Sequence, residues 1–176
     1  ASTLVPEEYP VIILVNEGTA SASEILTAAL KENNRATVIG SKTYGKGVMQ
    51  SEIPYLGGYL CIVTSSYTTP LDHDIHKIGI TPDIIVETEN YTDDDLKAYE
   101  KFMKSDKIKE YQKEHPEYSK ENILNFAEEN SKSGVPESLL CLLMRNEYIY
   151  SLDYDKRPIA DPEFDTALRR AIEEIC

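Results

Sequence analysis

The chain has 176 residues, enough for one ordinary domain or a domain with an appendage, and long enough to bury a hydrophobic core. Its 31 acidic and 18 basic residues give a formal net charge of −13, which repels a nucleic-acid backbone and an anionic membrane surface, so we expect neither as a partner. The three cysteines form no CxxC pair and no apolar run approaches the roughly 18 residues of a membrane-spanning helix, which argues against a zinc framework, a dense disulfide scaffold and a membrane span.

The N-terminal part of the chain predicts a βαβ unit. The run PVIILV at 10–15 is apolar throughout, which is typical of a fully buried strand. The segment ASEILTAALKEN at 22–33 predicts a helix, and ATVIG at 36–40 predicts a second buried strand. The first part of the chain is therefore expected to be α/β.

A glycine-rich connection, KTYGKGVMQ at 42–50, follows the second strand. The next segment, LGGYLCIVTSSYTT, contains Gly57-Gly58, a pair that favours a hairpin turn between two antiparallel strands. The short run DIIVE at 83–87 predicts one more strand. We take residues 1–90 as one region and expect it to end there, because the pattern changes afterwards.

Residues 91–176 are predicted to form a mostly helical C-terminal extension. They are rich in charge, poor in glycine, and free of an obvious repeat. The residues that recur at helical spacing near the start of this region are Leu96, Tyr99, Phe102 and Met103. A later apolar stripe, Leu139, Leu142, Leu143 and Ile149, favours core packing over a binding groove.

Several residues in this region predict where helices begin. Ser119 and Asp161 are typical N-caps, and Pro136 and Pro162 occur where a first helical residue is favoured. The last helix, predicted over 162–175, carries one apolar stripe. We expect this stripe to pack against the α/β part, with a subunit interface as the alternative.

Ser21 is the first candidate for chemistry. The pattern Ser21-Ala-Ser-Glu24 matches a capping box, in which the serine hydroxyl bonds an orphan amide and the glutamate bonds back. The N-terminus of a helix can also stabilise an oxyanion, and a strand-to-helix turn exposes a hydroxyl. A serine needs a base to become a nucleophile, so the two hypotheses differ in whether a base is present.

Histidine is the usual base, and the chain has three. His115 lies in a polar segment and is best interpreted as a solvated residue at a helix end. His73 and His76 lie in LDHDIHK beside Asp72 and Asp74, a composition that suggests a metal site. An acidic turn needs no ion, so the sequence favours a turn without metal.

Lys46 is the alternative base. It lies between two glycines, with no carboxylate close to it in sequence. If the fold buries the amine, its neutral form is favoured and can accept the serine proton. Gln50, four residues later, could orient the amine through a hydrogen bond without protonating it. An exposed loop lysine between turn glycines is the simpler alternative.

Three ordered motifs now suggest a family. NEGTASASEI, ATVIGSKTYGKGVMQ and YTTPLDHDIHKIGITPDI resemble the motifs of the C-terminal-processing (tail-specific) serine peptidases, over about residues 10–86. The resemblance implies that Ser21 is the nucleophile, Lys46 the base and Gln50 the residue that positions the lysine. Thr19 stands where the family often has serine, a mild substitution.

The resemblance also implies a mechanism and its missing parts. A Ser-Lys dyad would form an acyl-enzyme that water then hydrolyses. The amide of Ala22 would be one donor of the oxyanion hole. The family's PDZ domain and the glycine-rich segment that helps to form the oxyanion hole are not visible in this sequence. We therefore expect the chain by itself to be weakly active or inactive, because loss of one oxyanion donor typically lowers the rate about 10²–10³-fold.

By resemblance, residues 1–90 would be the incomplete catalytic core of a crotonase-like, Clp-protease-like layered fold. The implied protein is an endopeptidase that cleaves polypeptides near their C-termini, without metal or cofactor, in an extracytoplasmic compartment of a bacterium. Docking, access control and homo-oligomerisation are open roles for the helical region. Two rival hypotheses remain: a non-catalytic relative that holds a peptide or apolar ligand, and a fragment that self-assembles through unmet surfaces.

Overall fold

The structure is a computed structural model that describes residues 5–87 and 89–176. Its described residues divide into two compact units. The first unit runs to residue 87 and also includes 166–176, and the second is formed by 89–165. The last helix of the chain therefore belongs with the α/β part, although the sequence grouped it with the helical extension.

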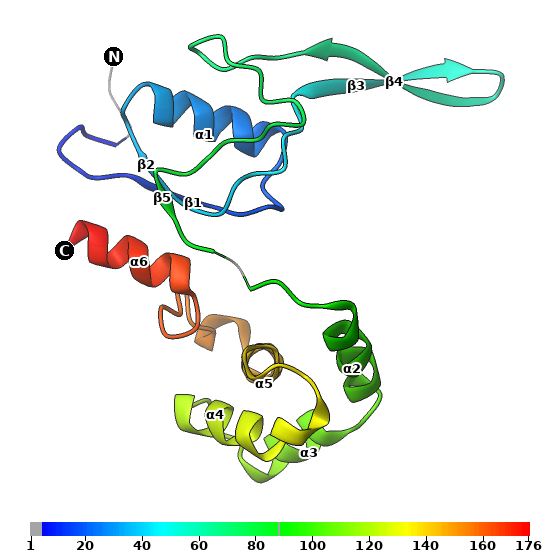
Figure 1. Cartoon of the computed structure of the whole chain (residues 1–176), viewed down its shortest axis with the longest axis vertical. Coiled ribbons are helices and arrows are strands. Elements are labelled where there is room, and N and C mark those ends of the chain that lie inside the picture. The colour runs from blue at the N-terminus through cyan, green and yellow to red at the C-terminus, as the bar shows by residue number, and fades with distance from the viewer. Residues whose placement is uncertain (1–4, 88) are drawn as a thin grey trace. The chain divides into compact units, whose positions relative to one another are not determined.

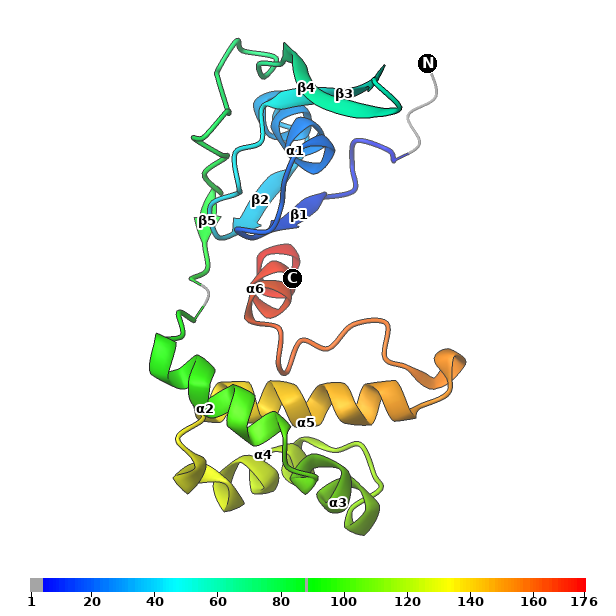
Figure 2. The same ribbon diagram turned by 90° about the vertical axis from the view of Figure 1, so that its right-hand side faces the viewer.

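The first unit is built on the expected βαβ element. Strand β1 (Ile12–Val15) is followed by helix α1 (Ala22–Glu32) and strand β2 (Thr37–Gly40), and β2 pairs in parallel with β1. Strand β5 (Ile84–Ile85) extends the sheet on the other side of β2, which gives the parallel order β1-β2-β5 (Figures 1 and 2). The prediction of an α/β region is confirmed.

Strand β2 is central, and its sequence explains why. Val38 and Ile39 are completely buried, as expected for a parallel strand that is covered on both faces. A small core then joins Ala28 of α1 to Ile75 and Ile80 in the loop before β5. Helix α6 (Thr166–Ile175) contacts β1 and β2, as predicted for the last helix, and buries Ala171. The predicted stripe is not its buried face, because Ile172 and Ile175 are 42% and 52% exposed.

The hairpin predicted after the glycine-rich connection is confirmed, but its turn lies one residue earlier. Strands β3 (Val48–Tyr55) and β4 (Gly58–Ser66) pair antiparallel and extend away from the sheet as a two-stranded arm (Figure 1). The central turn residues are Leu56 and Gly57, with φ of 46° and 79°, rather than Gly57 and Gly58. Both values are positive, as a type I′ turn requires, and glycine adopts such a φ without steric cost.

The second unit is helical. It contains α2 (Asp93–Met103), α3 (Lys107–Glu114), α4 (Lys120–Glu129) and α5 (Glu137–Ser151), with short 3₁₀ turns η1 (Ser131–Ser133) and η2 (Tyr154–Lys156) (Figures 1 and 2). Its core surrounds α5, and its fully buried members include Ile123, Phe126, Leu140, Met144 and Tyr148.

The predicted stripe on α5 is only partly core. Leu139 is buried and Leu143 packs against the core, whereas Leu142 remains 43% exposed. Pro136 directly precedes α5, one residue before its expected position. Ser119 caps α4, since its hydroxyl accepts a hydrogen bond from the Asn122 amide at 3.1 Å.

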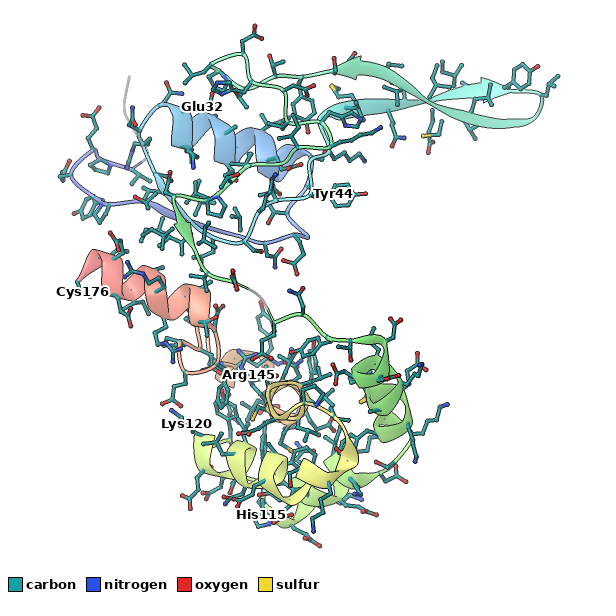
Figure 3. All side chains as sticks on the ribbon, viewed as in Figure 1. Glu32, Tyr44, His115, Lys120, Arg145 and Cys176 are labelled. Atoms are coloured by element: carbon teal, nitrogen blue, oxygen red, sulfur yellow. The ribbon has the colours of Figure 1, made fainter. Side chains whose placement is uncertain are left out.

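The prediction of a helix that begins at Asp161 and Pro162 is wrong, because α6 begins at Thr166. Asp161 instead accepts hydrogen bonds from Arg145 Nε at 2.6 Å and from the Tyr118 hydroxyl. Figure 3 shows Arg145 on α5, within the densely packed side chains of the second unit. The Asp161 carboxylate also accepts from the Glu163 amide, and the Asp161 carbonyl accepts from the Phe164 amide at 3.3 Å, so a separate turn follows Asp161 before α6 begins.

Within residues 5–87 and 89–176, no helix combines the length and the apolar character that crossing a membrane requires. The three cysteines, Cys61, Cys141 and Cys176, are free thiols.

Candidate active site

Ser21 occupies the turn between β1 and α1, and its backbone is strained. Its φ of 57° and ψ of −119° match the first central residue of a type II′ turn, a position that favours glycine. The Ser23 amide closes this turn by donating to the Ala20 carbonyl at 3.3 Å. A non-glycine residue in such a conformation costs about 1–3 kcal/mol and persists only where the surroundings impose it.

The residues before Ser21 form a compact loop that presents this turn. The Asn16 amide donates to Thr19 Oγ1 at 3.0 Å, and Asn16 Oδ1 accepts from the Gly18 amide at 3.0 Å. The Thr19 carbonyl accepts from the Tyr44 amide at 2.9 Å, which ties this loop to the loop that carries Lys46. The substitution of Thr19 for serine thus keeps a hydroxyl that is used locally.

Ala22 is the first residue of α1 and is exposed. The first amides of a helix have no intrahelical partner, and the helix dipole places partial positive charge there. The Ala22 amide therefore has the chemistry of an oxyanion donor next to the Ser21 hydroxyl.

Lys46 is half-buried, and its backbone is fixed from several sides. Its amide donates to Glu24 Oε2 at 2.8 Å, and its carbonyl accepts from the Tyr67 hydroxyl. The neighbouring Gly45 carbonyl accepts from the Lys77 amide at 2.8 Å. The backbone around Lys46 is therefore held by several hydrogen bonds. An exposed loop lysine without a function would not need them.

The loop of Lys46 interlocks with the loop before β5. The Thr43 amide donates to the Ile80 carbonyl at 3.1 Å, and the Ile80 amide donates to Thr43 Oγ1 at 2.7 Å. Gly79 has φ 74°, and a Cβ there would lie 2.2 Å from the Thr43 carbonyl oxygen. Only glycine allows this approach.

Glu24 connects the two candidate residues. Its Oε2 accepts the Ser21 amide at 2.9 Å and the Lys46 amide at 2.8 Å. Two amides that share one oxygen lie within about 6 Å of each other. Its Oε1 accepts the Thr43 hydroxyl at 2.6 Å and the Gly45 amide at 2.7 Å. The sequence identified Glu24 only as the capping-box partner and missed its bonds to the second loop.

Burial by itself would raise the pKa of the Glu24 carboxyl, because Glu24 is completely inaccessible to solvent. The hydrogen bonds from Thr43, Lys46, Gly45 and Ser21 outweigh burial and hold this pKa below its ordinary value. The carboxylate is consequently ionised at neutral pH and accepts from all four donors.

The side chains are less closely joined than the backbones. Within the described residues, no hydrogen bond links the Ser21 hydroxyl to the Lys46 amine, or the Gln50 side chain to Lys46. Gln50 is exposed on β3, next to an irregularity in the β3–β4 register at Met49 and Gln50. Catalytic hydrogen bonds are often long without substrate and shorten when substrate binds.

The acidic turn that suggested a metal site makes ordinary protein contacts. His73 Nδ1 lies 2.9 Å from Glu32 Oε1, and Asp72 Oδ1 accepts from the Thr68 hydroxyl at 3.0 Å. Asp74 Oδ1 accepts from the His76 amide at 2.8 Å. In residues 5–87 and 89–176, no group of three histidine, cysteine or acidic side chains converges as metal ligands do.

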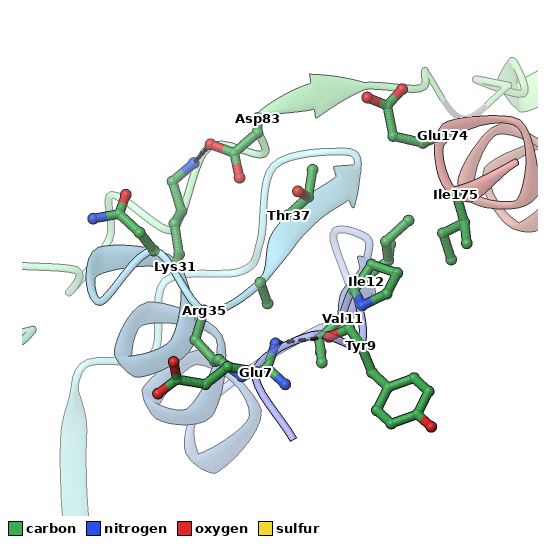
Figure 4. A pocket seen from close by; sticks show the side chains of 13 residues that line it. Glu7, Tyr9, Val11, Ile12, Lys31, Arg35, Thr37, Asp83, Glu174 and Ile175 are labelled. Atoms are coloured by element: carbon green, nitrogen blue, oxygen red, sulfur yellow. Dashed lines mark hydrogen bonds and ion pairs between the residues drawn. The ribbon is translucent and has the colours of Figure 1, made fainter. Parts of the chain in front are cut away.

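A cavity of about 510 Å³ lies at the opposite end of α1 from Ser21 (Figure 4). Its cations already have partners: Lys31 forms an ion pair with Asp83 at 2.7 Å, and the Arg35 guanidinium donates to the Tyr9 carbonyl at 3.2 Å. The cavity is lined by the ends of elements, and its polar groups hold the structure together.

Comparison with known proteins supports the motif assignment. Residues 3–86 match peptidase family S41. The chain is 53% identical over 81 residues to a carboxyl-terminal-processing protease of Synechocystis. This alignment covers 46% of this chain and 19% of that protein. It is 48% identical over 86 residues to a probable CtpA-like serine protease of Staphylococcus aureus. This alignment covers 48% of this chain and 17% of that protein. The resemblance inferred from the motifs is confirmed.

Among solved structures, the chain is similar to a photosystem II D1 C-terminal processing protease, with 41% identity and a TM-score of 0.44. That match covers 46% of this chain and 21% of the other. The chain spans about a fifth of the length of the curated relatives that it matches.

Proposed function

From the match of residues 3–86 to peptidase family S41, we propose that this chain carries the nucleophile and the base of a serine endopeptidase that cleaves polypeptides near their C-termini. In this proposal Ser21 is the nucleophile, Lys46 the general base and Gln50 the residue that orients the lysine. The Ala22 amide is one donor of the oxyanion hole.

The observation that supports this proposal best is the strained turn at Ser21. A helix cap has no need of the type II′ conformation, because N-caps ordinarily have extended backbone, as Thr92 and Ser119 have in this chain. Sharp strand-to-helix turns with a strained serine present the hydroxyl of the nucleophile in hydrolases. Capping and catalysis are therefore compatible at this residue.

The acylation step follows from these assignments. The neutral Lys46 amine accepts the proton of the Ser21 hydroxyl while Oγ attacks the scissile carbonyl carbon, and the carbonyl oxygen becomes an oxyanion that the Ala22 amide stabilises. Collapse of this intermediate breaks the C–N bond, and the lysine ammonium returns the proton to the leaving amine. The product of this step is an ester between Ser21 and the N-terminal part of the substrate.

Deacylation uses the same groups. Lys46 accepts a proton from water, the resulting hydroxide equivalent attacks the ester carbonyl, and Ser21 Oγ leaves with the proton that the lysine returns. No metal or organic cofactor takes part in this proposed cycle.

A non-catalytic, ligand-holding relative is the second candidate. It is favoured by an apolar cavity of about 290 Å³ that begins one helical turn after Ser21 and is lined by Ile25, Ala28, Ala29, Tyr67 and Ile75 among others. A scaffold would need neither a strained serine nor a rigidly held lysine loop, so this candidate ranks second.

From the resemblance we also propose a crotonase-like, Clp-protease-like layered fold and an extracytoplasmic location. The full-length protein is proposed to contain a PDZ domain and to form a homo-oligomer through the helical unit. Polypeptides are the proposed substrates.

Covalent labelling tests the nucleophile. The full-length protein is incubated with a fluorophosphonate, and the modified residue is identified by mass spectrometry. We expect phosphonylation of Ser21 that Lys46→Ala slows about 10²-fold or more, because the base is lost. Absence of label on Ser21, with labelling of another serine or of none, would favour the ligand-holding relative.

A further inference from the structure

We propose that Glu24 and Thr43 form a positioning pair that sets the nucleophile turn against the base loop. This inference rests on the proposed function and names two residues that the dyad does not include. Neither side chain would touch the substrate; each would act through the backbone of Ser21 or Lys46.

The bonds of Glu24 join segments that are distant in sequence. One carboxylate oxygen accepts the amides of Ser21 and Lys46, and these two residues are 25 positions apart. The other oxygen accepts the Gly45 amide and the Thr43 hydroxyl. Of these four bonds, a capping box requires only the one from the Ser21 amide. The remaining three all come from the loop of Lys46, so the carboxylate does more than end a helix.

Charge supports a positioning role. Glu24 is fully buried, and no salt bridge joins it to a cation in the part of the chain that the structure describes. An isolated buried carboxylate is destabilising unless donors satisfy it, and an apolar side chain at such a site often serves stability as well or better. Retaining the charge here provides an acceptor that holds four donors at fixed places.

Thr43 orients the carboxylate. Its hydroxyl donates to Glu24 Oε1 and accepts from the Ile80 amide at 2.7 Å, so both of its roles are occupied. Thr43 is 5% exposed, which leaves its hydroxyl no competing solvent partner. Through this residue the loop before β5 fixes one oxygen of Glu24, and the other oxygen is thereby aimed at the two amides.

A substitution that preserves shape and removes the hydroxyl isolates this effect. Thr43→Val deletes the donor to Glu24 and the acceptor of the Ile80 amide, whereas Thr43→Ser retains both. Thr27→Val is a matched control, because Thr27 is also buried but its hydroxyl donates to Ser23 within α1, at 2.7 Å. Glu24→Gln keeps the volume but replaces one acceptor by a donor that faces other donors.

The experiment measures phosphonylation of Ser21, together with kcat and KM for a peptide substrate, in the full-length protein. A displacement of about 1 Å can lower a rate about 10²-fold, so Thr43→Val and Glu24→Gln should lower the labelling rate and kcat about 10- to 10²-fold with KM little changed. Thr43→Ser should recover most of the rate, and Thr27→Val should match the wild type. Equal rates in folded Thr43→Val and wild type would overturn the proposal.

Amide hydrogen exchange on the wild-type protein tests the positioning pair without any variant. The amides of Ser21, Gly45 and Lys46 should exchange slowly and with similar protection, because one buried carboxylate binds all three. Exchange at the rate of exposed loop amides would overturn the proposal even if the variants fail to fold. If Ser21→Ala retains cleavage while these amides are protected, the proposed function fails and the positioning pair stands as a structural feature.

Discussion

At the scale of single residues, Ser21 has the position of a helix cap and a backbone conformation that an ordinary cap does not need. Its amide donates to Glu24 as in a capping box, yet its φ of 57° lies outside the range of an ordinary cap. Such strain is typical of functional sites, where the surroundings impose a conformation that the residue itself disfavours.

We expect Ser21→Gly to stabilise the protein by about 1 kcal/mol while abolishing cleavage, because glycine adopts this φ and ψ without strain and has no hydroxyl. Ser23→Gly, two residues later inside α1, should destabilise it by about 0.5–1 kcal/mol, because glycine weakens a helix. Urea unfolding of both variants measures whether each substitution raises or lowers the free energy of unfolding. A destabilised Ser21→Gly variant would show that the turn is relaxed in solution.

The sequence revealed these residues to different extents. Ser21 and Glu24 are recognisable locally, since a capping box spans four positions. Lys46 was identified through a family motif, because nothing in a local pattern links residues 25 positions apart. The bonds of Glu24 to Thr43 and Gly45 were not predictable, because they depend on how two loops interlock.

At the scale of elements, regular patterns were predicted better than their ends. The βαβ unit and the hairpin follow from apolar runs and turn residues. The turn at Leu56 and Gly57 was placed one residue late, because two adjacent glycines offered two choices. The start of α6 was predicted too early, because a separate turn follows Asp161 and the helix begins only at Thr166.

The hydrogen bonds that Asp161 accepts from Tyr118 and Arg145 make the stability of the helical unit depend on pH, at both alkaline and acidic pH. Burial and the hydrogen bond to Asp161 raise the pKa of Tyr118 to about 12, so its contribution to stability is complete below pH 10 and is lost between about pH 10 and 12. Burial acts upward on the pKa of Asp161, but the bonds from Tyr118 and Arg145 outweigh it and lower this pKa. Its contribution is present at neutral pH and is lost as the solution is acidified below the ordinary range of aspartate.

Ultraviolet titration of phenolate checks the alkaline limb. Burial also raises the pKa values of Tyr111 and Tyr148, but only that of Tyr118 is raised to about 12, so Tyr118→Phe should remove the step near pH 12. Tyr154→Phe is the control, since Tyr154 is 87% exposed and its substitution leaves the hydrogen bond between Tyr118 and Asp161 intact. A late step that persists in Tyr118→Phe would assign it to another tyrosine.

At the scale of the whole molecule, the end of the chain returns to the first unit. Helix α6 packs on β1 and β2. The second unit, residues 89–165, lies between β5 and α6 in the sequence. A deletion of residues 93–176 would therefore remove a part of the α/β unit as well. The assignment of residues 1–90 to the catalytic core stays a proposal, to which α6 should be added.

We expect Ala171→Glu to destabilise the first unit by about 2–4 kcal/mol, because it places an unpaired charge at the buried position of α6, where Ala171 is 5% exposed. Ile159→Glu, at a fully exposed position of the second unit, should change stability by less than about 0.5 kcal/mol. Thermal unfolding followed by hydrogen exchange reports each unit separately. Equal stability of the two variants would mean that α6 does not depend on this buried position.

The most direct test of the central claim is cleavage of an unfolded model protein by the full-length enzyme, compared with Ser21→Ala and Lys46→Ala, with products identified by mass spectrometry. The dyad predicts that wild type shortens the substrate near its C-terminus and that both variants, with folding intact, lose cleavage by at least about 10³-fold. Equal cleavage by all three proteins would contradict the dyad and leave Ser21 as a helix cap.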